Sequence, residues 1–591
     1  MMLFDALPRD VAALLASCLS VCELRALVRV SRAASQSIFH ERLMCHVRLV
    51  LPPNDAVVSR LLRPRRHAAP LAVSLADASH LPLLADCMPQ IETLRVSSDG
   101  YMQAYEPILH LPRLDSFLSL RRLDLSGSAI IGVVSLASLT ELVELDLSFT
   151  VVVDLRPLSR LTKLESLNLE DTRVKSIAVV QCMPELRVLN VNRTSALHDL
   201  SPITQLKKLE KIGINDKQLV DIEPIRAVAK SLKELDAIEI SFPGDIVTPA
   251  ERHEALASLT QLEHFTTWPM SWTQTLEPLV SLRHLTSLDL RFPPFTDLSP
   301  LQALTNLQDL RLMIAAARDT SPLRVLKRLE RLVLTGVTHD PHSLNFLDHL
   351  PLLRDLSLSG EIHVHNVSRL THLERVELNY SGVSSQGEKL TRTMCEALSN
   401  VISLSLRFPV GHPTDLSPLS CMNQLETLDL RYATPKELPT PDYFAFLHTL
   451  VNLKELRLAG GGIQDLQDLR FLTQLRGLDL TSTSVVDLTP LTRLQSLQKI
   501  ELGYTKIVDV SPLTQLPKLK RVTLPVDTNC TPLAEAEMAE LCEVFHEHAN
   551  CLWNERHRGE YDTKTEVNDL VHGEEALKVL ETAFGDYTGD Y

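Results

Sequence analysis

Leucines repeat along this chain in the frame Leu-x-x-Leu-x-Leu, which returns about every 22 residues. Because one such unit cannot bury its own apolar face, neighbouring copies must stack on one another, and the repeat predicts a solenoid. A weaker copy at Ile91 brings the number to about 19, with longer gaps near 232–262, 373–401 and 425–453. The other copies begin at Leu120, Leu142, Leu164, Leu186, Leu209, Leu232, Leu262, Leu285, Leu307, Leu329, Leu353, Leu373, Val401, Leu425, Leu453, Leu475, Leu497 and Leu519.

Each copy predicts a short strand, a turn and then a short helical or 3₁₀ segment on the back of the repeat. Alternate apolar residues of the strand should point inward. A threonine often follows the strand, where its hydroxyl can bond to turn backbone. These threonines are Thr150, Thr172, Thr194, Thr483 and Thr505. In the Ser-Pro pairs at 201, 299, 321, 417 and 511, we expect serine as the helix N-cap and proline as the first helical residue.

The array resembles the 22-residue leucine-rich repeats of internalins and of the repeat subunit that regulates protein phosphatase 1. The resemblance covers roughly residues 91–525, and threonine or serine stands where those families favour asparagine. It implies an α/β fold, a curved leucine-rich-repeat solenoid with parallel strands on the concave face. It specifies an architecture and not a partner.

Residues 7–43 lie outside the repeat and have a helical apolar spacing. They begin Leu7-Pro8, continue through Leu19 and Leu24, and reach Val30-Ser31, which resembles an F-box. The resemblance implies that Leu7, Pro8, Leu19, Leu24 and Val30 face the adaptor subunit of a cullin–RING ubiquitin ligase. The tryptophan common shortly after the Val-Ser pair is missing, and the alternative is a helical cap that shields the first repeat.

The ends of the array give the remaining boundaries. Residues 1–45 form the F-box-like segment, 46–90 a linker and N-terminal cap with a basic run at 60–67, and 526–591 a C-terminal cap and acidic tail. From residue 534 onward there are 15 Asp or Glu against 4 Lys or Arg, within a chain of net charge −15. We expect a helix over 534–549 that covers the last open turn. Its cysteines and histidines would point in several directions, so we expect no zinc site.

Composition bounds the class of protein. The chain has 45% hydrophobic residues, only 5% aromatic residues, and no apolar run long enough for a membrane span. Ten cysteines without a paired framework favour a reducing compartment. We found no convincing export signal near the N-terminus. These features predict a cytoplasmic location, with a nuclear one as the alternative.

The variable positions of the strands should form a mixed concave surface. Early copies are acidic and amide-rich there, at Asp124, Glu144, Asp146, Asn168, Glu170 and Asn190, and later copies carry arginines. Arginine beside an aromatic residue is typical of interface hot spots. The candidate partner-binding residues are Trp268, Arg291, Phe292, Arg311, Arg407, Phe408, Arg431 and Tyr432. The alternative is that Phe292 and Phe408 belong to the core.

No set of residues has the spacing of a catalytic or metal centre, since a phosphate loop and a nucleophile elbow are both missing. We therefore predict a protein without enzymatic activity or cofactors that binds protein partners, with nucleic acid disfavoured by the charge. The leading hypothesis is a substrate-recognition subunit of a cullin–RING ligase. The alternative is a scaffold or regulatory subunit with no ubiquitin role.

Overall fold

The computed structural model describes much of the repeat array. The described residues are 48–51, 72–75, 91–96, 114, 116–128, 130–215, 223–240, 249–270, 275–290, 295–315, 317, 319–337, 344–360, 362, 372–380, 390–408, 415–431, 443–460, 462–507, 509–525 and 543–547. The chain divides into two compact units at residue 273, the first containing strands β1 to β10 and the second β11 to β22. The F-box-like residues 1–45 lie outside the described part.

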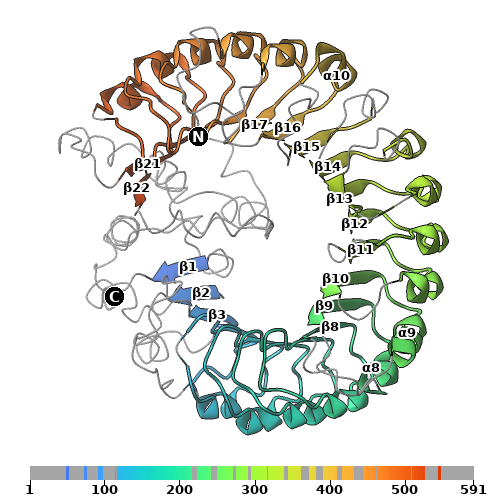
Figure 1. Ribbon diagram of the computed structural model, residues 1–591. Coiled ribbons are helices and arrows are strands. Elements are labelled where there is room, and N and C mark those ends of the chain that lie inside the picture. Colours follow the sequence, from blue (N-terminus) through green and yellow to red (C-terminus); the bar gives the residue numbers. More distant parts are fainter. Residues whose placement is uncertain are drawn as a thin grey trace, which may run out of the picture. The chain divides into compact units, whose positions relative to one another are not determined.

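The strands of the first unit pair in parallel, each with the next along the chain (Figure 1). They are β1 (Arg48–Leu51), β2 (Ala72–Leu75), β3 (Thr93–Val96), β4 (Arg122–Asp124), β5 (Glu144–Asp146), β6 (Ser166–Asn168), β7 (Val188–Asn190), β8 (Lys211–Asn215), β9 (Glu234–Ile240) and β10 (His264–Met270). Strands β1 and β2 fall within residues 46–90, so the sheet extends into the segment expected to be a linker and cap.

The second unit repeats the same parallel pairing from β11 to β22. Its strands are β11 (Ser287–Leu290), β12 (Asp309–Met313), β13 (Arg331–Val337), β14 (Asp355–Gly360), β15 (Arg375–Tyr380), β16 (Ser403–Arg407), β17 (Thr427–Asp429), β18 (Glu455–Arg457), β19 (Gly477–Asp479), β20 (Lys499–Glu501), β21 (Arg521–Pro525) and β22 (Glu543–Glu547).

The predicted helix over 534–549 is wrong at its centre, because Glu543–Glu547 is strand β22. It pairs in parallel with β21. The physical reason is that β21 would otherwise leave a row of backbone donors and acceptors open, and a further strand satisfies them.

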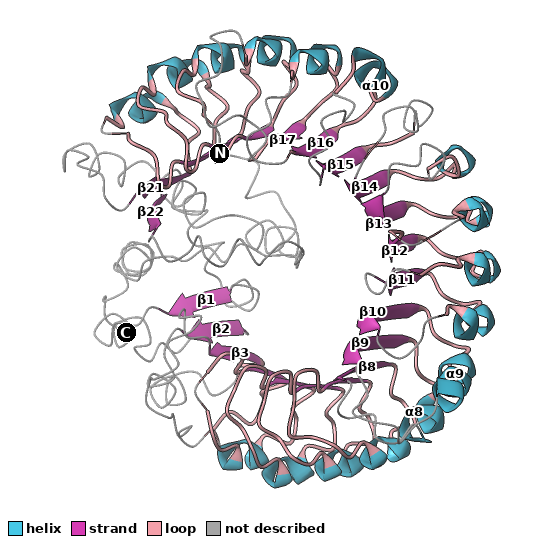
Figure 2. Cartoon of the chain, in the orientation of Figure 1, coloured by secondary structure: helices cyan, strands magenta, loops and turns pink. Residues whose placement is uncertain are grey.

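Helical segments lie on the side opposite the strands in each unit (Figure 2). Most are single 3₁₀ turns, as expected from the repeat length. They are η2 (Val134–Ser138), η3 (Arg156–Arg160), η4 (Ala178–Cys182), η5 (Ser201–Gln205), η7 (Glu277–Ser281), η8 (Ser299–Ala303), η9 (Ser321–Val325), η10 (Leu347–His349), η12 (Ser417–Cys421), η13 (Ala445–Thr449), η14 (Gln467–Phe471), η15 (Thr489–Arg493) and η16 (Ser511–Gln515). Two of the longer gaps in the repeat hold α9 (Pro249–Ser258) and α10 (Arg392–Ala397), and α8 (Glu223–Val228) lies in the copy that begins at Leu209. None of the described helices is both long and apolar enough to span a bilayer.

Leucines of the repeat frame fill the core between the strands and the helical segments. In β12, Leu310 and Leu312 are buried, whereas Asp309, Arg311 and Met313 are partly exposed on the opposite face. Burial of such a leucine contributes roughly 1.5 to 3 kcal/mol. The alternation confirms that the apolar positions point inward, and it places the variable positions on the exposed face of the sheet.

Threonine hydroxyls bind the turn backbone as predicted. The hydroxyl of Thr483 donates to the carbonyl of Leu480 at 2.6 Å, and Thr150, Thr172 and Thr505 make the equivalent bond. These threonines are buried. The hydroxyl therefore satisfies a carbonyl that water cannot reach.

The expected capping role of serine in the Ser-Pro pairs is wrong. Each 3₁₀ segment begins at the serine with proline second, and leucine holds the N-cap of η8 without a side-chain hydrogen bond. The backbone amide of Ser299 instead donates to the carboxylate of Asp297 at 2.9 Å. Aspartates 199, 319, 415 and 509 do the same in their repeats. An aspartate two residues ahead forms an Asx turn, and this arrangement leaves serine free to enter the helix.

One turn position in several repeats adopts a left-handed backbone. Gly127 and Gly460 occupy it with positive φ, and so do five residues with side chains. The five are Phe149, Asp171, Arg193, Ser482 and Tyr504, with φ between 52° and 57°. Because this conformation is unfavourable for residues other than glycine, the repeated turn must be enforced by the stacked neighbours.

Candidate protein-binding surface

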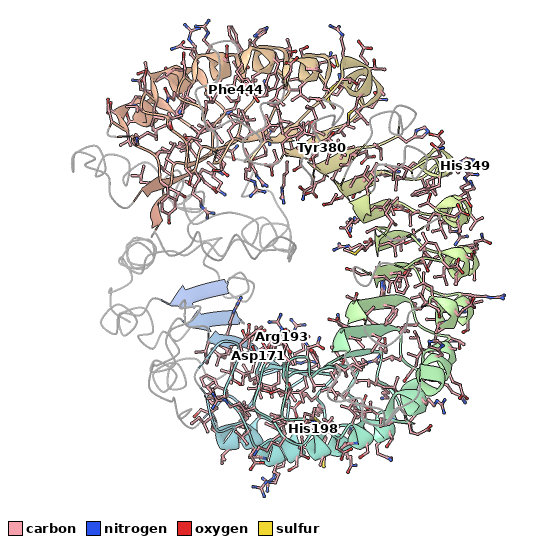
Figure 3. All side chains as sticks on the ribbon, viewed as in Figure 1. Asp171, Arg193, His198, His349, Tyr380 and Phe444 are labelled. Atoms are coloured by element: carbon pink, nitrogen blue, oxygen red, sulfur yellow. The ribbon has the colours of Figure 1, made fainter. Side chains whose placement is uncertain are left out.

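The exposed face of each strand carries two residues from the variable positions of the frame. Strand neighbours in the ladder align these residues, so that Asp289 of β11 faces Arg311 of β12, and Asp309 faces Arg331 of β13. We call the strand-facing surface of each unit its concave face. Figure 3 shows Asp171 and Arg193 on this inner side of the first unit, whereas His198 lies towards its outer side.

The predicted arginines of the second unit are held to different extents by carboxylates. Arg311 lies 3.9 Å from both Asp289 and Asp309, and Arg407 lies 3.7 Å from Glu377. These are loose ion pairs on partly exposed side chains. Such pairs contribute little to stability, so both guanidinium groups can exchange their partner for another carboxylate.

Arg431 is bound much more tightly. Its Nε and Nη2 atoms donate to the carboxylate of Asp429 at 2.9 to 3.1 Å, and Asp429 is only 7% exposed. This forked geometry fixes the guanidinium within the chain. Arg431 therefore has a structural role on this surface, in addition to any contact with a partner.

Phe408 is intermediate between the two sequence-based alternatives, an exposed partner-binding residue and a buried core residue. It is neither fully buried nor fully exposed, and its ring stacks on Tyr380 of the preceding repeat with 5.0 Å between centroids and 11° between planes. Tyr380 ends β15 and Phe408 follows β16, so the stack lies at the carboxyl edge of these strands. The neighbouring Arg407 gives this edge the arginine and aromatic combination that the sequence predicted.

The remaining predicted residues lie mostly outside the described part. Arg291, Phe292 and Tyr432 fall in gaps between described segments, as do all five adaptor-binding residues, Leu7, Pro8, Leu19, Leu24 and Val30. Trp268 belongs to β10, for which the backbone pairing with Ile238 of β9 is given.

An alternating ladder of charges crosses four strands of the second unit. Asp309, Arg331, Asp355 and Arg375 share one register position on β12 to β15. Their ion pairs measure 3.2 Å, 3.4 Å and 3.0 Å in that order. Each interior charge therefore has an opposite charge on both sides, and the ladder is neutral as a set. The alternation follows from the register of the strands.

The concave face of the first unit has a different character, with carboxylates and amides in neighbouring strands. Asp146, Asn168, Asn190, Gly213 and Asp236 share one register position on β5 to β9. Glu170 and Asn192 follow β6 and β7. We call Asp146, Asn168, Glu170, Asn190, Asn192 and Asp236 the acidic floor. The sequence predicted the first four of these residues and missed Asn192, which follows β7, and Asp236, which lies on β9.

Gly213 is the feature that joins the two halves of the acidic floor. A Cβ at Gly213 would collide with Oδ1 of Asn190 and would crowd Nδ2 of Asn192. Both amides therefore lie over β8, and Nδ2 of Asn192 reaches Oδ2 of Asp236 on β9 at 3.3 Å. In the sequence, the signal for this contact across β8 was Gly213 itself, a glycine at a strand position of the copy that begins at Leu209.

Two carboxyl groups of the acidic floor have raised pKa values. Burial raises the pKa of Asp236 to about 6, and the charges of Glu170 and Glu234 act in the same direction against Lys211. Burial likewise raises the pKa of Glu170, with Arg193 opposing. Both shifts reflect carboxylates that are partly removed from water without full compensation by a cation.

Within the described segments, no group of three or more His, Cys, Asp or Glu side chains is placed to hold a metal ion. The exposed carboxylates and guanidinium groups are suited instead to ion pairs and hydrogen bonds with another macromolecule. The two concave faces are thus polar surfaces of different charge.

Comparisons with known proteins show similarity in fold. No protein-family model matches the chain, and no curated protein matches it. The solved structures that resemble it include TLR13 in a complex with ssRNA13, at 19% identity and a TM-score of 0.44 over 83% of this chain and 72% of that chain. A leucine-rich-repeat protein of Leptospira interrogans matches at 20% identity and a TM-score of 0.35, over 72% and 96%. An internalin of Listeria monocytogenes matches at 19% and 0.24, over 67% and 85%.

The class of this protein rests on its own repeat. Parallel strands, buried frame leucines and one helical turn per copy are present in both units. The chain is a leucine-rich-repeat protein, as the sequence predicted.

Proposed function

We propose that this protein is a binding subunit that holds protein partners on its concave faces. The observation that carries the proposal is the arrangement of charged and amide side chains in register across neighbouring strands, above all the acidic floor of the first unit. Stacked repeats provide extended surfaces of this kind, which suit macromolecules better than small ligands. Partner charge would then decide which face is used.

Within this role, we propose recruitment of substrates to a cullin–RING ubiquitin ligase. Support comes from the F-box-like residues 1–45 and from their place before a leucine-rich-repeat array. In this mechanism the N-terminal segment binds the ligase adaptor while a concave face holds the substrate. Other subunits carry out the ubiquitin transfer.

Co-purification of the full chain with the ligase adaptor tests the ligase role. We expect binding by the full chain, and loss of binding after deletion of residues 1–45 or after a triple substitution of Leu7, Pro8 and Leu19 by alanine. Circular dichroism should show that both variants keep a folded repeat array. Equal recovery of adaptor with all three proteins, or with none, would contradict the ligase role.

The second candidate is a scaffold or regulatory subunit without a ubiquitin role. It is favoured by the missing tryptophan after Val30-Ser31, where Arg32 to Ser37 reads Arg-Ala-Ala-Ser-Gln-Ser. In that case residues 1–45 cap the first repeat, and their deletion should destabilise the array. Partner binding that survives in the absence of any adaptor would favour this candidate.

A further inference from the structure

The acidic floor has more carboxylate than the described cations around it can neutralise. Arg193 lies 3.8 Å from Glu170, and Lys211 is engaged by Glu234 at 2.5 Å. Among the described residues, Asp146 and Asp236 have no ion pair within 4 Å, and their contacts are hydrogen bonds from Ser148, Asn168 and Asn192. The floor therefore presents uncompensated negative charge.

A buried amide oxygen provides a second and independent observation. Asn192 is 1% exposed, and its Oδ1 atom has no hydrogen-bond donor within the described part of the chain. Its Nδ2 atom lies against Asp236, so the unsatisfied acceptor belongs to the same cluster. An unsatisfied buried oxygen destabilises the folded state, and such a group calls for a donor.

The second unit shows how the same fold neutralises its concave carboxylates. There Asp309 and Asp355 lie within 3.4 Å of arginines on adjacent strands. In the first unit, the register positions between Asp146 and Asp236 hold two asparagines and a glycine instead. Amides keep the surface polar and supply no positive charge. The ladder contains its own arginines, whereas positive charge for the acidic floor must come from a partner.

We propose that the acidic floor binds a basic, extended segment of a protein partner, with one arginine or lysine at the Asp236 and Asn192 end and a second at the Asp146 and Glu170 end. This inference rests on the proposed protein-binding function and names the chemistry of the partner. A guanidinium or ammonium group supplies both the missing charge and hydrogen-bond donors.

Strand spacing sets the distance between the two basic residues. Asp146 and Asp236 lie on β5 and β9, four strand steps apart. At about 4.8 Å per step the separation is about 19 Å, which an extended chain covers in about six residues. The preferred segment therefore has basic residues at positions i and about i+6.

Photo-crosslinking with a defined peptide tests the proposal. The probe is an acetylated, amidated peptide with two arginines at i and i+6, neutral residues between them and a central benzophenone. Its companions carry the arginines at i and i+2, or citrulline in place of both. Mass spectrometry of the crosslinked full-length protein then maps the contact sites, and crosslinks to the acidic tail at 534–591 are counted separately.

The matched variants separate the acidic floor from general charge attraction. Asp236→Asn with Glu170→Gln removes two charges of the floor, whereas Asp355→Asn with Asp309→Asn removes two from the ladder. We expect crosslinks within residues 146–236 with the i+6 peptide, reduced about fivefold to tenfold in the floor variant and unchanged in the ladder variant. Circular dichroism and thermal melts establish that each variant is folded.

Three results would overturn the proposal: crosslinks confined to the acidic tail, an equal decrease in both variants, or equal labelling by the citrulline peptide. Adaptor binding depends on residues 1–45 and is read out separately. A negative crosslinking result at the acidic floor would therefore not contradict the ligase role. Loss of adaptor binding would likewise not contradict peptide binding at the acidic floor.

Discussion

At the scale of single residues, Asp236 shows how this protein retains a destabilising group on its surface. The carboxyl is mostly buried, its pKa is raised from 3.8 to about 6, and its hydrogen bond from Asn192 is long. Folded proteins seldom keep such a group without a use, because a neutral side chain of the same shape is easily found. Its position on the acidic floor provides that use.

Asp236→Asn should stabilise the folded protein at neutral pH. The raised pKa means that the folded state binds the proton more tightly than the unfolded state, so the stability contributed by the neutral carboxyl is present below about pH 4 and lost as pH rises through about 6. Above that pH the substitution should raise the free energy of unfolding by about 2 to 3 kcal/mol. Thermal melts from pH 4 to pH 8 measure the difference.

Asp355→Asn provides the control for this prediction. Asp355 pairs with Arg331 and Arg375, so its loss should lower stability, by up to about 1 kcal/mol for such exposed pairs. If Asp236→Asn lowered stability as well, or if its effect were the same at pH 4 and pH 8, the interpretation of Asp236 would be wrong.

At the scale of elements, the turn after each strand is built by side chains that satisfy backbone groups. Thr483 donates to the Leu480 carbonyl, while Asp487 accepts from the backbone amide of Thr489 at 2.8 Å. The hydrogen bonds to Thr489 hold the pKa of the Asp487 carboxyl below its ordinary value. The hydrogen bond of Thr483 lies in the core and that of Asp487 is exposed, so only the first should affect the free energy of unfolding strongly.

Thr483→Val should destabilise the protein by about 0.5 to 1.5 kcal/mol, because the shape is kept while the buried Leu480 carbonyl loses the hydroxyl donor and retains only the backbone amide of Thr483. Thr483→Ser retains the hydroxyl and should cost less, with only a methyl group removed. Urea unfolding followed by circular dichroism measures both. Equal losses for valine and serine would mean that packing, and not the hydrogen bond, is the contribution of Thr483.

Sequence reasoning predicted these elements unevenly, for physical reasons. The strands and core follow from the leucine period, since a frame such as Leu475 to Leu480 permits only one inward face. The role of Asp297 was missed because serine before proline has the same signature in a helix cap and in an Asx turn. The acidic floor was half predicted: Asp146 lies in a regular copy, but Asp236 reaches Asn192 only because Gly213 opens the path between them.

At the scale of the whole molecule, stacked repeats make stability local. Within each unit, the described strands pair with their neighbours along the chain, and the frame leucines are buried between the strands and the helical segments. Energetics of this kind behave as a sum of repeat and nearest-neighbour contributions. A defect should therefore spread over a few repeats and not over both units.

Leu167→Ala in the first unit and Leu478→Ala in the second test this expectation. Both leucines are at most 2% exposed, and each substitution should cost about 2 to 5 kcal/mol locally. Hydrogen exchange with mass spectrometry should show lost protection in the altered repeat and its neighbours. Leu352→Ala, at a residue that is 49% exposed, is the control. Uniform loss of protection over both units would show a single cooperative array instead.

The charge ladder of Asp309, Arg331, Asp355 and Arg375 limits how the second unit can change length. Repeat proteins grow and shrink by gaining or losing whole copies, and loss of a single interior copy from a ladder that alternates in sign brings like charges together. Loss of the copy with Arg331 would bring Asp309 against Asp355, and duplication of any one member would place like charges side by side. A change by two adjacent copies would keep the alternation of charge in this stretch, while the neutral amide positions of the first unit carry no such constraint.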